Sequence, residues 1–227
     1  MALEPISMVL EANSMELEAI STTLGTVSTV LEAVGTFAGL FRLKGIGPFY
    51  LITSMKILAI SGSLRNPSST HLVLQHIASL VPKDIVFEVY ESTGDLPHFD
   101  DSPRPPVEVE KWRKALQEAD ALLICTPEYA FGVPGSLKNA IDWTVGSGEF
   151  VDKPTALVTA ATGGEKAHAA LLMILTALSA HVKEDGALLI SFVRSKMDKE
   201  GRITHVETLL QLEKVVNALV SSIKASV

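Results

Sequence analysis

The sequence predicts an α/β fold: a doubly wound parallel sheet of five strands with helices on both faces. Short apolar runs alternate with longer segments whose apolar residues have helical spacing. The short runs are apolar at nearly every position, which is typical of parallel strands buried on both faces. Strands that alternate with helices favour a parallel sheet, whose crossover connections are right-handed. These observations favour one domain over residues 55–227.

The elements follow in order from residue 56. Met55 marks a change in composition, from a segment rich in Ser, Thr and Gly to an apolar run. Proline and Asp-Gly pairs mark the boundaries of helices and strands. Pro105 and Pro106 precede the second expected helix, and Asp185-Gly186 precedes the fifth strand. We expect strands at 56–60, 85–90, 121–125, 155–160 and 187–193, and helices at 69–81, 107–119, 135–146, 165–182 and 206–225.

Residues 1–54 are expected to form an N-terminal extension outside this domain. Apolar residues at steps of three and four run from Leu17 to Phe41, which favours a helix. The same segment is rich in Gly, Ser and Thr, which form helices less readily. Two interpretations remain open. The extension is dispensable, as an upstream translated stretch, a tag or a mobile segment, or it is an added helix that packs on the domain or on a second subunit.

Composition argues against several classes of function. The net charge is −7 and no run of Lys or Arg is present, so nucleic acid is not an expected partner. No apolar stretch reaches the roughly 20 residues of a membrane-spanning helix, and no cationic leader precedes the domain. Cys125 is the only cysteine, which excludes an intrachain disulfide and favours a reducing compartment. We therefore expect a cytoplasmic protein.

The loop after the first strand is a candidate anion site, because sheets of this class bind ligands beyond the carboxyl ends of their strands. Gly62 allows a tight turn, Ser63, Ser68 and Thr70 offer hydroxyl donors, and Arg65 can pair with a phosphate. The start of a helix adds amides and a favourable dipole. Neither the G-x-G-x-x-G nor the Gly-Lys-Ser/Thr pattern is present, so the loop is expected to hold phosphate without cleaving it.

Each candidate loop also has a purely structural interpretation. In the first loop, Ser68 or Ser69 caps the helix and Arg65 is solvated. In the loop after the third strand, Tyr129 either borders a flat ring together with Phe131 or is a core aromatic residue. In the loop after the fourth strand, Thr162 and two glycines either offer amides to a ligand or form a helix entrance capped by Thr162.

The motifs in these loops resemble those of the NADPH-dependent FMN reductase family, which has a flavodoxin-like fold with strand order 2-1-3-4-5. They are Ile60-Ser-Gly-Ser-Leu-Arg65 with Ser68, Thr126-Pro-Glu-Tyr129, Pro134-Gly135-x-Leu137-Lys-Asn-Ala-Ile-Asp-Trp143 and Gly163-Gly164. The resemblance covers Met55 to the C-terminus. It implies a reductase that transfers hydride from NADPH or NADH to FMN and then reduces quinone, azo, metal-oxyanion or flavin acceptors. The alternatives are a flavodoxin-like electron carrier and a non-catalytic flavin-binding sensor.

Matching positions imply which residues surround FMN. Those expected around its phosphate are Ser63, Arg65, Ser68, Ser69 and Thr70; those expected along the isoalloxazine ring are Pro127, Glu128, Tyr129 and Ala130, with Thr162 and Gly163 near the far edge. Among the acidic residues of these loops, Glu128 is expected to orient the ligand. Ala130 stands where many members have Asn, and the third loop is shorter than in common members. No catalytic side chain and no metal are expected.

The resemblance also implies a homodimer or homotetramer. Trp143 is expected either to pack within its own chain or to contact a neighbouring subunit. The loop 96–99 is a second candidate contact with a partner.

Overall fold

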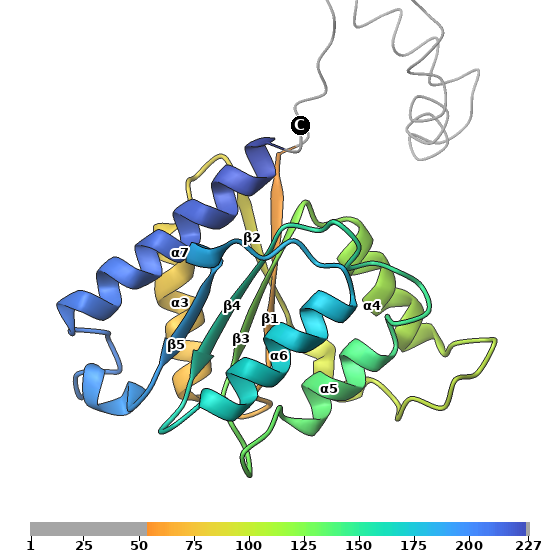
Figure 1. The fold of residues 1–227 in the computed structure, drawn as a ribbon, viewed down its shortest axis with the longest axis horizontal. Helices are drawn as coiled ribbons and strands as arrows, with labels where there is room; N and C mark the ends of the chain where they lie inside the picture. Colours follow the sequence, from red (N-terminus) through yellow and green to blue (C-terminus); the bar gives the residue numbers. More distant parts are fainter. Residues whose placement is uncertain (1–53, 226–227) are drawn as a thin grey trace, which may run out of the picture. The chain divides into compact units, whose positions relative to one another are not determined.

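The computed structural model describes residues 54–225 (Figure 1). The expected extension, residues 1–54, lies outside the described residues apart from Ser54. Within the described part of the chain, no helix has the length and apolar character needed to cross a membrane.

Five parallel strands form one sheet with the order β2-β1-β3-β4-β5. This confirms the predicted fold class and strand order. In chain order the elements are β1 (Lys56–Ser61), α3 (Ser69–Leu80), β2 (Val86–Tyr90), η1 (Glu91–Asp95), α4 (Val107–Gln117), β3 (Ala121–Thr126), α5 (Gly135–Asp142), β4 (Thr155–Ala160), α6 (Glu165–Ala177), η2 (Glu184–Gly186), β5 (Ala187–Ile190), η3 (Val193–Lys196) and α7 (Val206–Ala225), where η denotes a 3₁₀ turn.

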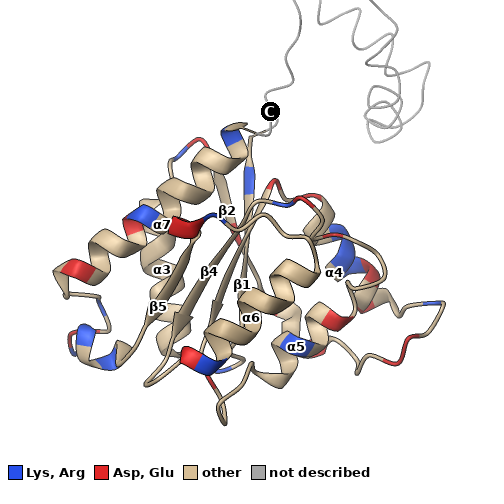
Figure 2. Cartoon of the chain, viewed as in Figure 1, with Lys and Arg blue, Asp and Glu red and all other residues tan. Residues whose placement is uncertain are grey.

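Both faces of the sheet are buried because successive strand residues point to opposite sides. In β1, Ile57 and Ala59 belong to the core beneath α3 and α7. Leu58 and Ile60 belong to the core beneath α4, α5 and α6. Figure 1 shows these two helix layers on either side of the sheet. Strands β3, β4 and β5 carry no charged residue, and Figure 2 shows most charges on helices and outer loops.

The fifth strand is shorter than its apolar run predicts. It ends at Ile190, and the expected strand continued to residue 193. Phe192 adopts a left-handed backbone conformation (φ 53°), which turns the chain out of the sheet. The amides of Phe192 and Val193 then donate to the carbonyls of Thr162 and Ala161. The apolar run therefore joins the end of the strand to the loop after β4.

Two expected helices also end early. Helix α6 stops at Ala177 instead of residue 182, and Ser179 just beyond it has a left-handed backbone (φ 56°). Helix α5 stops at Asp142, four residues short of the expected end at 146, and continues as hydrogen-bonded turns. Neither difference moves the residues at the carboxyl edge of the sheet.

The carboxyl ends of β1 and β3 meet closely because the residue after β1 is glycine. The Gly62 amide donates to the Cys125 carbonyl at 2.8 Å. A Cβ atom at Gly62 would lie 2.2 Å from Thr126 Oγ1 and 3.0 Å from Thr126 Cα. Glycine is thus required at position 62 by this close approach and not by a left-handed backbone conformation. The contact joins the roots of the first two candidate loops.

Candidate functional site

A cleft of about 700 Å³ lies along the carboxyl edge of the sheet. Most of its lining comes from the loops after β1, β3 and β4, and Val193 and Arg194 after β5 complete it. Every residue predicted to bind the cofactor lines this cleft except Ser63. The tertiary structure therefore brings together residues as far apart in the sequence as Arg65, Tyr129 and Thr162.

The first turn of α3 presents backbone donors to the cleft. The Ser68 hydroxyl caps the helix by accepting from the His71 amide at 3.1 Å, as the structural interpretation of this loop predicted. The amides of Ser69 and Thr70 have no acceptor within residues 54–225. Arg65 is exposed and forms no ion pair with the described acidic residues. One end of the cleft thus combines an unpaired guanidinium with two free amides.

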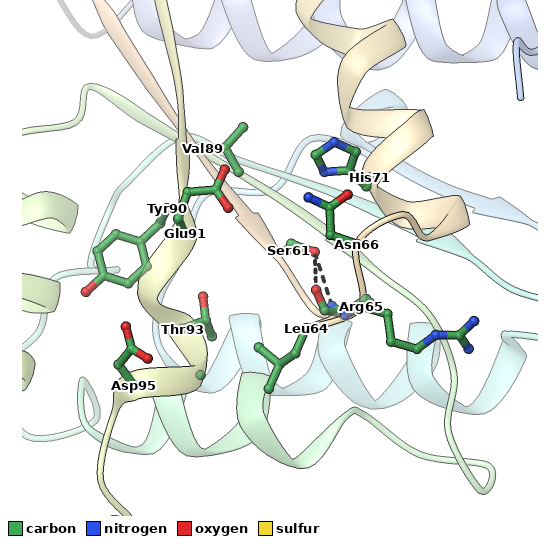
Figure 3. A pocket seen from close by; sticks show the side chains of 12 residues that line it. Ser61, Leu64, Arg65, Asn66, His71, Val89, Tyr90, Glu91, Thr93 and Asp95 are labelled. Carbon is green, nitrogen blue, oxygen red and sulfur yellow. Dashed lines mark hydrogen bonds between the residues drawn. The ribbon is translucent and has the colours of Figure 1, made fainter.

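Ser63 has a different place from its neighbours. Its side chain is only 7% exposed. Its Oγ accepts from the Arg65 amide at 3.3 Å and lies 3.3 Å from Tyr129 Oη. It lines a second pocket of about 380 Å³ between this loop and η1, which Arg65 also lines. In Figure 3 the Arg65 side chain extends away from the other side chains of that pocket.

Tyr129 begins a tight turn at the rim of the cleft. The amide of Tyr129 donates to the Gly132 carbonyl at 3.1 Å, and the Gly132 amide donates to the Tyr129 carbonyl at 2.9 Å. Between them, Ala130 (φ 48°) and Phe131 (φ 60°) both have left-handed backbones. The Tyr129 side chain is 45% exposed and Phe131 is 82% exposed. Tyr129 is therefore not a core aromatic residue, and the turn presents two aromatic side chains at the rim.

The Glu128 carboxylate connects the loop after β3 to the start of α6. Its Oε2 accepts from the amides of Lys166 and Ala167, both at 2.9 Å. These are amides that a helix cannot satisfy internally in its first turn. A carboxylate there is also favoured by the helix dipole. The side chain of Glu128 thus holds two walls of the cleft together.

The loop after β4 enters α6 through a glycine. Gly164 is the residue that precedes the helix and has a left-handed backbone (φ 111°). The capping carboxylate comes from Glu128, so the interpretation of Thr162 as the helix cap is wrong. Thr162 is exposed and lines the cleft with Gly163.

Arg194 also lines the cleft, although the sequence did not lead us to predict it. It lies in η3, directly after the turn that ends β5. A signal was present, because carboxyl ends of parallel strands share one edge and a basic residue follows the fifth expected strand.

Burial favours the neutral form of two ionisable side chains near the cleft. Burial raises the pKa of the Cys125 thiol, whose Sγ lies 3.7 Å from the Thr70 carbonyl oxygen. The Cys125 side chain is completely buried. Burial also lowers the pKa of His168, whose Nδ1 lies 2.9 Å from Thr159 Oγ1. Within residues 54–225, no three His, Cys, Asp or Glu side chains gather as metal ligands.

Trp143 packs within its own chain. It is only 1% exposed, its Nε1 donates to the Pro97 carbonyl at 2.8 Å, and Phe99 lies edge-on against its ring. Of its two expected roles, the structure supports packing. The loop 96–99 covers the Trp143 ring, and the Phe99 side chain remains exposed.

Known proteins are similar to this chain in sequence and in fold. The sequence profile of a family described as NADPH-dependent FMN reductase matches residues 55–194. An NAD(P)H-dependent FMN reductase from Pseudomonas aeruginosa is 33% identical over 173 residues, which cover 73% of this chain and 93% of that protein. A quinone reductase from Escherichia coli is 28% identical over 165 residues, which cover 68% of this chain and 88% of that protein.

A solved structure agrees with the sequence comparison. The flavoenzyme NAD(P)H:(acceptor) oxidoreductase from Paracoccus denitrificans aligns with a TM-score of 0.61 and 27% identity, covering 75% of this chain and 98% of that chain. The motifs of all three candidate loops lie within the segment that the family profile matches. The chain therefore belongs to the NADPH-dependent FMN reductase family.

Proposed function

We propose that the protein is an FMN-dependent oxidoreductase that uses NAD(P)H to reduce small-molecule acceptors such as quinones, azo compounds, metal oxyanions or free flavin. Family membership makes it a flavin-dependent oxidoreductase; the acceptors and the roles of individual residues are our proposal. The observation that carries the proposal is the cleft, where loops from three strands combine phosphate donors with an aromatic turn at the rim. A quinone reductase is among the relatives.

The residues present suit FMN. The cleft volume of about 700 Å³ falls within the roughly 300–1,000 Å³ that cofactor sites occupy. Arg65 and the free amides of Ser69 and Thr70 are donors for a phosphate dianion at a helix N-terminus. When bound, FMN supplies the redox chemistry, and the protein supplies binding and orientation.

The charges of the cleft set the direction of the ligand. Arg65 lies beside the first turn of α3, where the dipole also attracts anions. At the other end, a Cβ atom at Gly163 would lie 3.1 Å from Glu165 Oε2 and 3.5 Å from Glu128 Oε1, so two carboxylates surround this glycine. A dianionic tail is favoured near Arg65 and disfavoured near Gly163. The flat ring then lies toward Pro127, Tyr129 and the loop after β4.

The two rim residues have separate tasks in this proposal. The Tyr129 ring borders the isoalloxazine, and its hydroxyl, 3.3 Å from Ser63 Oγ, keeps the ring next to the phosphate loop. The Glu128 carboxylate orients the ligand indirectly, because it positions the loop after β3 against α6. Ala130 provides only backbone groups.

The absorbance spectrum of the purified protein tests this function. We expect a flavin spectrum after FMN is supplied, and fast bleaching when NADPH or NADH is added without oxygen. Reoxidation by an added quinone then completes the turnover. A protein that binds FMN but is not bleached by either nicotinamide is an electron carrier or a sensor, and a protein that refuses FMN contradicts the cofactor assignment.

We also propose that residues 55–227 form a flavodoxin-like, FMN-binding reductase domain and that residues 1–54 are dispensable. The family profile begins at residue 55, which supports this boundary. Deletion of residues 1–54 is expected to leave the unfolding midpoint, the oligomer size and FMN binding unchanged. A large loss in stability or in oligomer size would instead favour an added helix that packs on the domain or on a second subunit.

A homodimer or homotetramer in the cytoplasm completes the proposal. Phe131, Phe192 and Leu64 are large apolar side chains that are mostly exposed in this chain, and a second subunit would cover such surface. Size-exclusion chromatography with light scattering measures the oligomer.

Cell fractionation checks the location, for which the single cysteine is the supporting observation.

A further inference from the structure

We propose that Arg194 is a second phosphate-binding residue of the cleft and that its ligand is a phosphate monoester. This inference rests on the proposed function, which supplies two such groups: the 5′-phosphate of FMN and the 2′-phosphate of NADPH. Both carry the same dianionic chemistry, and a guanidinium binds it through two parallel hydrogen bonds.

The first observation is that two segments hold the region of Arg194 in place. On one side, the amide of the preceding residue, Val193, donates to the Ala161 carbonyl in the cleft wall at 3.1 Å. The Val193 side chain is buried in the core beneath α3 and α7. Arg194 therefore follows an anchored residue and lies beside the loop after β4.

The second anchor ties the same segment to α3. Beyond η3 the chain folds back through paired backbone contacts between Met197 and Ile203. Gly201, in this return, packs so closely on α3 that a Cβ atom would lie 2.7 Å from Leu72 Cδ1. The segment that carries Arg194 thus packs against the helix whose N-terminus forms the anion-binding end of the cleft.

The third observation is the charge balance. Like Arg65, Arg194 is exposed, lines the cleft and forms no ion pair with an acidic residue in the part of the chain that the structure describes. The carboxylates of the cleft, Glu128 and Glu165, gather around Gly163 instead. Two guanidinium groups that are not paired with protein carboxylates therefore line one ligand cleft, which suits a dianion better than a neutral group.

The test compares ligands that differ by one phosphate monoester in the Arg194→Met variant. If the ligand group is the FMN 5′-phosphate, the dissociation constant of FMN should rise by about tenfold, and that of riboflavin should stay unchanged. If it is the 2′-phosphate of NADPH, the KM for NADPH should rise by about tenfold, while the KM for NADH and FMN binding stay unchanged. Flavin fluorescence measures the dissociation constants without any turnover.

Two further variants separate a specific contact from general charge. Lys196→Met removes the same charge from the same 3₁₀ turn, but Lys196 does not line the cleft. The ratio of the FMN and riboflavin dissociation constants and the ratio of the NADPH and NADH KM values should therefore stay near those of the wild type. Arg194→Lys keeps the charge without the guanidinium fork and should have an intermediate effect.

The proposal is overturned if Arg194→Met leaves both the FMN-to-riboflavin and the NADPH-to-NADH ratios unchanged. It is equally overturned if riboflavin binding weakens as much as FMN binding, or if Lys196→Met matches Arg194→Met. Failure of the proposed function differs from these outcomes, because then the wild-type protein itself binds no FMN or fails to oxidise NAD(P)H.

Discussion

The loops after β1 and β3 face the same cleft but use their polar groups differently. In the first loop, the Arg65 guanidinium and the amides of Ser69 and Thr70 have no protein partners within residues 54–225. In the second, the backbone of Tyr129 pairs with Gly132, and the Glu128 carboxylate is bound to α6. The polar groups of the first loop are thus available to a ligand, whereas those of the second loop stabilise the loop itself and its contact with α6. Loss of the Arg65 guanidinium should therefore weaken ligand binding, whereas loss of the Glu128 carboxylate should weaken the fold.

The largest effect is expected where the two loops meet, at Gly62. Gly62→Ala places a methyl group 2.2 Å from Thr126 Oγ1, so the strand ends must separate. Overpacking of this kind costs about 3 kcal/mol of unfolding free energy, or more. Urea unfolding measures it. Gly135→Ala is the matched control, because a Cβ atom there meets nothing within 4 Å. Equal stability of the two variants would contradict the close approach.

Arg65→Ala should affect the ligand and leave the fold intact. Loss of a hydrogen-bonded charge costs about 1.5–3 kcal/mol, so the dissociation constant of FMN should rise by roughly 10- to 100-fold. The unfolding free energy of the ligand-free protein should change by less than about 0.5 kcal/mol, because the side chain is exposed. Arg104→Ala removes an exposed arginine that does not line the cleft and should alter neither quantity. Unchanged FMN affinity in Arg65→Ala would disprove the phosphate assignment.

Glu128→Ala should mainly lower the unfolding free energy, whereas Arg65→Ala mainly weakens FMN binding. The Lys166 and Ala167 amides lose their acceptor, so the unfolding free energy should fall by about 1–2 kcal/mol, as for other lost helix caps. Glu128→Gln keeps one acceptor oxygen and should lose less. Glu165→Ala removes another carboxylate from the same helix start and should cost about 0.5 kcal/mol, because only the dipole interaction is lost. If Glu165→Ala costs as much as Glu128→Ala, the bound carboxylate of Glu128 has no special role.

The smallest effect is expected at Ala130, within the turn. A left-handed backbone costs an L-residue about 1–2 kcal/mol, and glycine avoids this but loses more entropy on folding. Ala130→Gly should therefore stabilise the protein by about 0.5 kcal/mol, and Ala130→Val should destabilise it by about 1 kcal/mol, because β-branched residues tolerate positive φ least. Thermal unfolding of the pair measures the difference. The same sign for both substitutions would contradict a strained turn.

The elements and the loops differed in how well the sequence predicted them. All five strands were predicted at the right places, since their apolar patterns are set by neighbouring residues. The predicted end of β5 was wrong because the apolar run continues through Phe192. The left-handed backbone of Phe192 depends on hydrogen bonds to a distant loop. Ten of the eleven residues predicted from the motifs to surround FMN line the cleft, and Ser63 lies outside it. Arg194, Val193 and Glu165 also line the cleft and were not predicted.

By itself, the sequence determined the fold class, the family and the loops that could bind a ligand. Those conclusions depend on local patterns: buried strands, helical spacing and short motifs at strand ends. Only the tertiary structure decided that Glu128 caps α6, that Ser63 faces Tyr129 and that Arg194 enters the cleft. The Glu128–Lys166 and Ser63–Tyr129 contacts join residues 38 and 66 positions apart. They therefore depend on strand order and on how closely the loops pack, which no local pattern contains.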